Sequence, residues 1–152
     1  VKCNPAVKTA ADRQALRDAL AQGLIDTIGS DHAPHLLSEK DGTYCKAPSG
    51  LPSIQQTLPV LLTIAAQEEI PLTRIASVFS ENAAALYGLN RGKIAAGYDA
   101  DLVVFDYSKE FQVKTEDQLS KCGWTPYEGE TLKGVIEAVY INGQEKTISP
   151  GL

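Results

Sequence analysis

The stretch Leu24-Ile25-Asp26-Thr27-Ile28-Gly29-Ser30-Asp31-His32-Ala33-Pro34-His35 decides how this chain is interpreted. Its apolar first part, residues 24–28, predicts a buried strand. The chain leaves this strand through Gly29-Ser30 and then presents one carboxylate, Asp31, and both of its histidines, His32 and His35. Acidic and imidazole groups at the carboxyl end of a strand are typical of parallel α/β barrels, which display their chemistry there.

A helix is predicted directly before this strand. Thr9 and Asp12 have the spacing of a capping box, and Gly23 is placed to end the helix. The apolar face of this helix is expected to consist of Leu16, Ala19 and Leu20. A helix followed at once by a strand is the second half of a βαβ unit.

Residues 36–52 carry charges, Gly and Pro without a sustained period, so they predict a loop whose length suggests function. Ser53 with Gln56 is a candidate capping pair for the helix that follows, and Pro59 must lie in its first turn or kink it. A second helix is expected at about 72–79, and Ser80 is a candidate cap for a third that ends at Gly88. The stripe of the first of these helices is formed by Leu58, Leu61, Leu62, Ala65 and Ala66.

After Gly88 the pattern changes from helical to β. Short β runs are expected at Ile94, at 102–105 and around Phe111 and Val113, and residues 135–141 are also rich in β-formers. Asn142-Gly143 is the strongest hairpin signal of the chain. We therefore place a domain boundary near 89–92, which divides the chain into residues 1–90 and 91–152.

Length and composition limit the fold and the partners. The chain has 152 residues, 43% of them hydrophobic and 22% charged, as in soluble globular proteins. A closed eight-stranded α/β barrel needs roughly 200 residues or more, so the chain is too short for one. Its net charge of −5 argues against a nucleic-acid partner. The three cysteines form no C-x-x-C, which favours a reduced, cytoplasmic compartment, and neither a membrane-spanning run nor a signal peptide is visible.

Four motifs carry a family resemblance. They are the G-S-D-H-A-P-H run at 29–35 with Glu39-Lys40 and Ala47-Pro48-Ser49-Gly50 after it, the segment Lys2-Cys3-Asn4-Pro5-Ala6-Val7-Lys8, the segment Gly97-Tyr98-Asp99-Ala100-Asp101-Leu102-Val103-Val104-Phe105-Asp106, and the segment Ser120-Lys121-Cys122-Gly123-Trp124-Thr125-Pro126-Tyr127-Glu128-Gly129. Together they resemble the dihydroorotases, which are metal-dependent amidohydrolases. The third motif is shared across many amidohydrolases, and the second and fourth are more specific to dihydroorotases.

The resemblance implies an α/β fold: the C-terminal part of a TIM-type barrel followed by strands of a small β-sandwich subdomain. It implies that Asp31 contacts one metal of a two-zinc site and shuttles the proton between water and the departing amide nitrogen. Asn4, His35 and the backbone of Ser49 and Gly50 would hold the substrate. The family's other metal ligands, an H-x-H pair, a carboxylated lysine and two further histidines, have no match in this chain. The first six βα units are thus absent, and a chain that begins at Val1 inside an expected strand fits a fragment.

Simpler interpretations compete at several of these residues. Asp31 also fits a turn or helix-capping aspartate, and Asn4 fits a simple turn opener. We expect His32 to be structural, because adjacent residues of an extended chain point to opposite faces. Lys8 stands where the family has Arg, so any contact to an anion there would be looser. We expect Cys3 and Cys45 to take no part in the chemistry, and Trp124 and Tyr127 to pack in the sandwich.

The resemblance therefore implies the activity of a dihydroorotase, which interconverts N-carbamoyl-L-aspartate and dihydroorotate in pyrimidine synthesis, and we expect this chain to be inactive alone. The expected partners are the missing N-terminal part of the barrel and further copies of the same protein, because open strand edges seek a partner. Two alternatives stay open. One is a hydantoinase-like or allantoinase-like cyclic amidohydrolase, and the other is a non-catalytic dihydroorotase-like partner domain.

Overall fold

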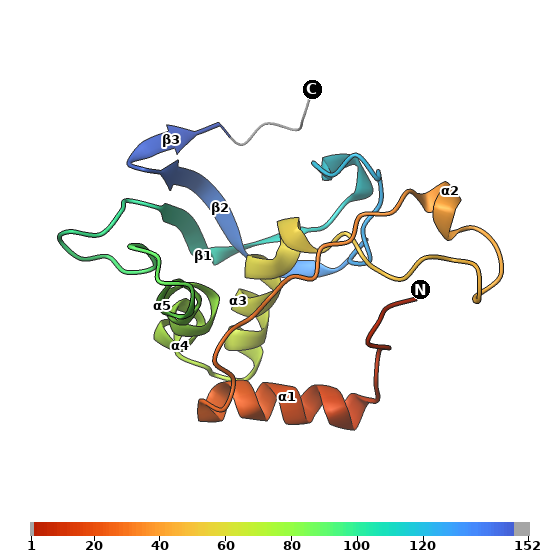
Figure 1. Cartoon of the computed structure of the whole chain (residues 1–152), viewed down its shortest axis with the longest axis horizontal. Coiled ribbons are helices and arrows are strands. Elements are labelled where there is room, and N and C mark those ends of the chain that lie inside the picture. The colour runs from red at the N-terminus through yellow and green to blue at the C-terminus, as the bar shows by residue number, and fades with distance from the viewer. Residues whose placement is uncertain (1, 148–152) are drawn as a thin grey trace.

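The computed structural model describes residues 2–147, in which helices precede a small antiparallel sheet (Figure 1). The helices are α1 (Ala10–Gln22), α2 (Leu37–Lys40), α3 (Thr57–Gln67), α4 (Leu72–Ala76) and α5 (Asn82–Leu86), with short turns η1 (Ile54–Gln56), η2 (Ser77–Glu81) and η3 (Thr115–Asp117). The strands are β1 (Leu102–Gln112), β2 (Thr131–Ile141) and β3 (Gln144–Lys146), in the order β1-β2-β3. None of the helices in the described part is long and apolar enough to cross a membrane.

Helix α1 begins and ends where its sequence predicts. The Thr9 hydroxyl accepts a hydrogen bond from the Asp12 N–H, and the Asp12 carboxylate accepts one from the Thr9 N–H, which completes the capping box. Gly23 ends the helix in the left-handed conformation, with φ 83°. The predicted apolar face is only partly correct, because Leu20 is buried whereas Leu16 is 64% exposed. Only the C-terminal end of α1 therefore contacts the core.

Residues 24–28 are extended but do not form the predicted strand; Figure 1 shows them within a bare trace that rises from α1 toward α2. Their backbone groups bond to the α4–α5 region instead of to neighbouring strands. The Ile28 N–H donates to the Val78 carbonyl (3.0 Å), and Arg74 and Asn82 side chains donate to the carbonyls of Ile25 (2.6 Å) and Asp26 (2.9 Å). The single parallel bridge of the described residues joins His32 to Leu51.

Helices α4 and α5 run into each other through the π turn η2, so residues 72–86 form one continuous helical segment. Ser80 lies inside this turn, and its predicted role as the cap of a separate helix is therefore wrong. Val78 in the same turn is fully buried and accepts the bond from Ile28. The segment ends just before Gly88, as predicted, with Gly88 at φ 65°.

The main hydrophobic core lies between α1, α3 and the α4–α5 segment. Pro59 lies in the first turn of α3, as expected. The predicted capping pair before α3 is wrong, because the Ser53 hydroxyl donates to the Ser30 carbonyl (2.6 Å) and caps nothing. The buried cluster consists of Leu20, Leu61, Ala65, Ile70, Ile75 and Val78, with Ile25, Ile28, Leu58 and Ile64 packed against it.

The sheet packs on α3 through β2. A Cβ atom on Gly134, which has φ 91°, would lie 2.4 Å from Leu62 Cδ1, so only glycine allows this approach. The Lys133 N–H also donates to the Thr63 hydroxyl of α3 (2.8 Å). The Asn142-Gly143 hairpin is confirmed between β2 and β3, with both residues at positive φ. No strand forms at Ile94, which is 93% exposed.

The Asp99-Ala100-Asp101 motif has a structural task at the start of β1. Arg91 binds both of its carboxylates, with N–O distances of 3.1 Å to Asp99 and 2.7 Å to Asp101. Asp101 also accepts the Asn142 N–H (2.8 Å), and the Gly143 N–H donates to the Ala100 carbonyl (2.9 Å). The motif thus joins the chain after α5 to the β2–β3 hairpin. The domain boundary that we predict near 89–92 falls within this connection and stays a prediction.

Candidate active site

The segments that carry the predicted site residues meet at Gly50. The Gly50 N–H donates to the Lys2 carbonyl (3.0 Å), two residues before Asn4. The next carbonyl, that of Leu51, accepts the Ala33 N–H (2.9 Å), which lies between Asp31 and His35. Gly50 is buried at φ 126°, and a Cβ there would lie 2.4 Å from the Ala33 Cβ. The space beside Gly50 is therefore occupied by Ala33 of the same chain.

Asp31 projects from a strained backbone position. Its φ of 45° lies in the left-handed region, which non-glycine residues seldom occupy and which is found repeatedly at functional sites. Its side chain is exposed, as is that of Asn4. The Asp31 carboxylate is therefore exposed and available to contact a metal ion or a substrate.

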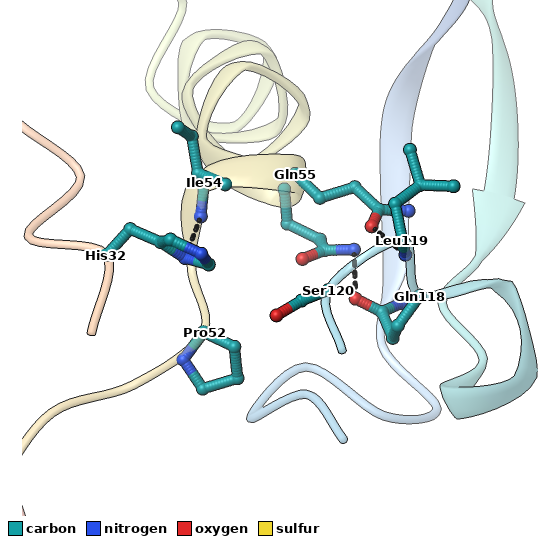
Figure 2. Close-up of a pocket in the computed structure, with 8 residues that line it drawn as sticks. His32, Pro52, Ile54, Gln55, Gln118, Leu119 and Ser120 are labelled. Atoms are coloured by element: carbon teal, nitrogen blue, oxygen red, sulfur yellow. Dashed lines mark hydrogen bonds between the residues drawn. The ribbon is translucent and has the colours of Figure 1, made fainter. Parts of the chain in front are cut away.

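His32 is held by backbone groups, which supports its predicted structural role. Its Nδ1 accepts the N–H groups of Ser53 (3.1 Å) and Ile54 (3.3 Å), so the neutral ring carries its proton on Nε2. His32 and Pro52 face Gln118, Leu119 and Ser120 across a cavity of about 310 Å³ (Figure 2).

Two glutamines of η1, directly before α3, fasten the 117–119 segment to this region, a link that our sequence analysis missed. The side-chain amide of Gln55 donates to the Asp117 carbonyl (2.9 Å) and accepts the Leu119 N–H (2.8 Å). The buried Gln56 donates to the Gln118 side chain (3.0 Å). No backbone partner of this kind has a sequence signal, because any backbone stretch offers the same groups.

His35 is half-buried and contacts both its own loop and the distant Trp124. Its ring Nδ1 lies 3.8 Å from the Glu39 carboxylate, which also accepts the Leu36 N–H (2.7 Å). Its carbonyl accepts the indole N–H of Trp124 (2.8 Å). The expectation that Trp124 packs in a sandwich is therefore wrong, since its indole reaches back to the loop of the histidine motif.

Two lysines hold the loop that carries Ser49 and Gly50. Lys40 Nζ donates to the carbonyls of Pro48 (2.7 Å) and Gly50 (2.5 Å), on either side of Ser49. Lys2 Nζ donates to the carbonyls of Tyr44 (3.0 Å) and Ala47 (2.8 Å). The N–H and the carbonyl of Gly50 both have partners, whereas Ser49 makes no hydrogen bond to other described residues. Lys40 belongs to the Glu39-Lys40 part of the sequence motif, and its role in holding this loop has no signal in the sequence.

The cysteines lie apart from one another, and all are free. Cys3 is half-buried near Tyr127; burial of the phenol, together with the nearby Cys3, raises the pKa of Tyr127. Cys45 is exposed. Cys122 is buried with its Sγ 3.2 Å from the Ser120 hydroxyl.

The described residues alone do not fit a metal centre. Among residues 2–147, no group of three or more His, Cys, Asp or Glu side chains is placed to hold a metal ion. A catalytic zinc site needs about three protein ligands and an open position. Asp31 could supply one ligand, and we therefore assign no step through a metal to these residues.

Comparison with known proteins places the chain in a family. Residues 3–146 match the amidohydrolase family model. The dihydroorotase of Halobacterium salinarum is 41% identical over 92% of this chain and 33% of its own length. That of Methanosarcina acetivorans is 39% identical over 99% of this chain and 31% of its own. The chain thus spans about a third of the length of these relatives.

Solved structures lead to the same family. The L-hydantoinase (dihydropyrimidinase) of Arthrobacter aurescens superposes with a TM-score of 0.89 and 29% identity, over 95% of this chain and 33% of that one. The D-hydantoinase (dihydropyrimidinase) of Thermus sp. superposes with a TM-score of 0.87 and 30% identity, with the same coverage. By sequence and by fold, this chain belongs to the amidohydrolase family.

Proposed function

We propose that this chain belongs to a dihydroorotase, which interconverts N-carbamoyl-L-aspartate and dihydroorotate. The observation that supports this most is the meeting of three motifs at Gly50, in a chain 34–41% identical to several dihydroorotases. Amidohydrolase family membership alone supports only a cyclic amide hydrolase. The narrower proposal of dihydroorotase activity depends on the roles of Asp31, Asn4, His35 and Ser49.

In this proposal Asp31 carries the proton. In ring opening, water adds to the ring amide carbonyl and the C–N bond breaks. Asp31 takes one proton from the water and returns it to the departing nitrogen, so Asp31 itself ends unchanged. The second proton of the water is released when the new carboxyl group ionises. A general acid–base of this kind contributes typically 10²–10⁴-fold to a rate. The exposed side chain and unusual backbone of Asp31 suit this task.

Asn4 and His35 hold the substrate carboxylate in this proposal. The Ser49-Gly50 loop holds the amide edge of the ring, and the contacts inside the chain indicate which of the two residues makes that contact. Because both backbone groups of Gly50 already have partners, Ser49 is the residue of the pair that can offer its N–H and carbonyl to a ligand.

The rest of the enzyme is also part of the proposal. The chain would supply the last βα units of a TIM-type barrel, and the remaining units would come from a missing N-terminal part. A zinc pair would be held mainly by ligands of that part, with Asp31 as the single ligand from this chain. Residues 24–28 lead directly to Asp31 and have the apolar composition of a buried strand, which supports a place in the barrel. We expect a cytoplasmic homo-oligomer.

Two other functions have specific support. The solved relatives are hydantoinases, which favours a hydantoinase-like activity. Residues 2–147 contain no group of side chains placed to hold a metal ion, and a non-catalytic partner domain would lack such a group too.

A substrate panel separates the three. The protein containing this chain together with a complete set of metal ligands is loaded with zinc and offered dihydroorotate, N-carbamoyl-L-aspartate, hydantoin and allantoin. Products are quantified by chromatography. The proposal expects turnover of the first pair only. Turnover of hydantoin or allantoin instead would support the alternative enzyme, and failure to turn over any of them with metal bound would support the partner domain.

A further inference from the structure

A second cavity, of about 330 Å³, lies beside the loop that carries Ser49. It is lined by Lys2, Leu37, Lys40, Gly42, Tyr44, Ala47 and Trp124. None of the predicted catalytic or substrate-binding residues is among them. We propose that this cavity binds a small planar organic anion, a carboxylate on an unsaturated ring.

The charge of the cavity favours an anion. Lys2 and Lys40 both line it, and no acidic side chain does. Among the described residues neither lysine forms an ion pair within 4.0 Å. The nearest acids in sequence do not line this cavity: Glu39 binds the Leu36 N–H, and Asp41 lines a neighbouring cavity that it shares with Lys40. Two cationic side chains thus share one cavity in a chain whose net charge is −5.

Each lysine keeps one N–H donor for a ligand. An ammonium group has three donors, and two on each lysine are bonded to backbone carbonyls. Those carbonyls hold the two lysines in place without neutralising their charge. A carboxylate accepts charge-assisted hydrogen bonds, which are roughly twice as strong as neutral ones.

The walls favour a flat, apolar ligand body. Tyr44 and Trp124 present aromatic rings, and Leu37 and Ala47 are aliphatic. The lysines lie near these rings, with Lys2 Nζ 5.2 Å from the Tyr44 centroid and Lys40 Nζ 6.0 Å from that of Trp124. The volume is at the low end of small-molecule sites, which begin at about 300 Å³. A single ring with one carboxylate matches this size and these surfaces, and inorganic phosphate would leave the walls uncovered.

Trp124 lines the cavity and is the only tryptophan of the chain, so its fluorescence reports binding there. The 152-residue chain is titrated with sodium benzoate, and Trp124 fluorescence is recorded. Benzamide has the same shape without the charge, and inorganic phosphate has the charge without the ring. We expect benzoate to saturate with a Kd of about 1 mM or tighter. Benzamide should not saturate, and phosphate should compete at least about tenfold more weakly.

Variants locate the binding. Lys2→Met and Lys40→Met should each weaken benzoate binding at least about tenfold, because each removes one charge. Lys46→Met is the matched control, since Lys46 is exposed in the same loop but does not line the cavity, and its affinity should not change. The comparison of benzoate with benzamide needs no variant and stands even if a lysine variant misfolds. The proposal would be overturned by equal fluorescence responses to benzoate and benzamide. It would also be overturned if phosphate bound as tightly as benzoate, or if Lys46→Met lost as much benzoate affinity as the other two variants. The titration uses neither metal nor turnover, so its result is independent of the proposed dihydroorotase activity.

Discussion

The indole N–H of Trp124 donates a hydrogen bond to the main-chain carbonyl of His35, 89 positions earlier in the chain, at 2.8 Å. Gln55 adds bonds to residues 117 and 119. The 117–127 segment, which leads from β1 to β2, is thereby fastened to the loops around the candidate active site. A change in this segment can therefore act on the site without touching a ligand.

The first prediction concerns Lys40→Met. The substitution removes the bonds to the carbonyls of Pro48 and Gly50, so the Ser49 loop should open more often. We expect the Gly50 amide, which donates to Lys2, to exchange with solvent at least about tenfold faster, while amides of α1 keep their rates. Hydrogen exchange followed by NMR measures both. Lys46→Met should leave the Gly50 rate unchanged, and unchanged exchange in Lys40→Met would show that the lysine does not hold the loop.

The second prediction concerns Gly50→Ala. A methyl group here would meet the Ala33 Cβ at 2.4 Å, in addition to the strain of φ 126°. We expect a loss of roughly 1–3 kcal/mol in the free energy of unfolding beyond that of the control, measured by denaturant titration. The control is Gly42→Ala, because Gly42 has the same φ of 126° and nothing within 4 Å of the added atom. Equal losses in the two variants would mean that strain alone acts and that the contact with Ala33 is unimportant.

The third prediction concerns pH and Asp106 in β1. Hydrogen bonds from the Ser108 side chain, then from Lys109 and the Ser108 N–H, lower the pKa of Asp106 from 3.8 to about 2. A lowered folded-state pKa means that the stabilisation is present above pH 3.8 and is lost as the pH falls toward 2. The melting temperature of the wild type should exceed that of Asp106→Asn near neutral pH, and the gap should close over this interval. A gap that persists unchanged at pH 2 would contradict the assignment.

The fourth prediction concerns zinc. Asp31 is the only residue of the chain that matches a metal ligand of the family, so the 152-residue chain alone should retain no zinc pair after gel filtration and should not turn over dihydroorotate. Elemental analysis and a turnover assay on the same sample test this. Recovery of about two zinc ions per chain with turnover would overturn it.

Local signals in the sequence were reliable guides to the fold. The Thr9–Asp12 capping box, Gly23 and Asn142-Gly143 act through neighbouring backbone atoms, and all three form as predicted. Predictions that depend on distant partners were less successful. Residues 24–28 have the composition of a strand, but a ladder needs neighbours, and here their backbone bonds to Arg74, Val78 and Asn82. Ser53 has the spacing of a cap, yet its hydroxyl found the Ser30 carbonyl.

The candidate site shows the same limit. The motif residues around Asp31 and Gly50 could be chosen from the sequence, because a resemblance carries residue types and spacing. The sequence does not predict the bonds by which Lys2 and Lys40 hold the Ser49 loop, or the bond from Trp124 to His35. Their acceptors are backbone carbonyls. Every residue offers such a carbonyl, so sequence patterns do not identify the one that is used.

His35 provides the contrast for the central claim. In the protein that carries a complete set of metal ligands, His35→Ala should raise KM for dihydroorotate more than it lowers kcat, because a contact to the substrate carboxylate exists in the ground state and the transition state alike. Metal content should stay at the wild-type level. Loss of metal in this variant would identify His35 as a ligand and not as a substrate contact.

The most direct test of the account is kcat of Asp31→Asn in the same protein, with metal measured on the same sample. Asparagine keeps the size of the side chain and much of its hydrogen bonding but cannot carry the proton. If Asp31 shuttles the proton, kcat for dihydroorotate should fall at least about 10²-fold while metal is retained wholly or in part. A kcat close to that of the wild type would contradict the role of Asp31 and, with it, the mechanism proposed for this chain.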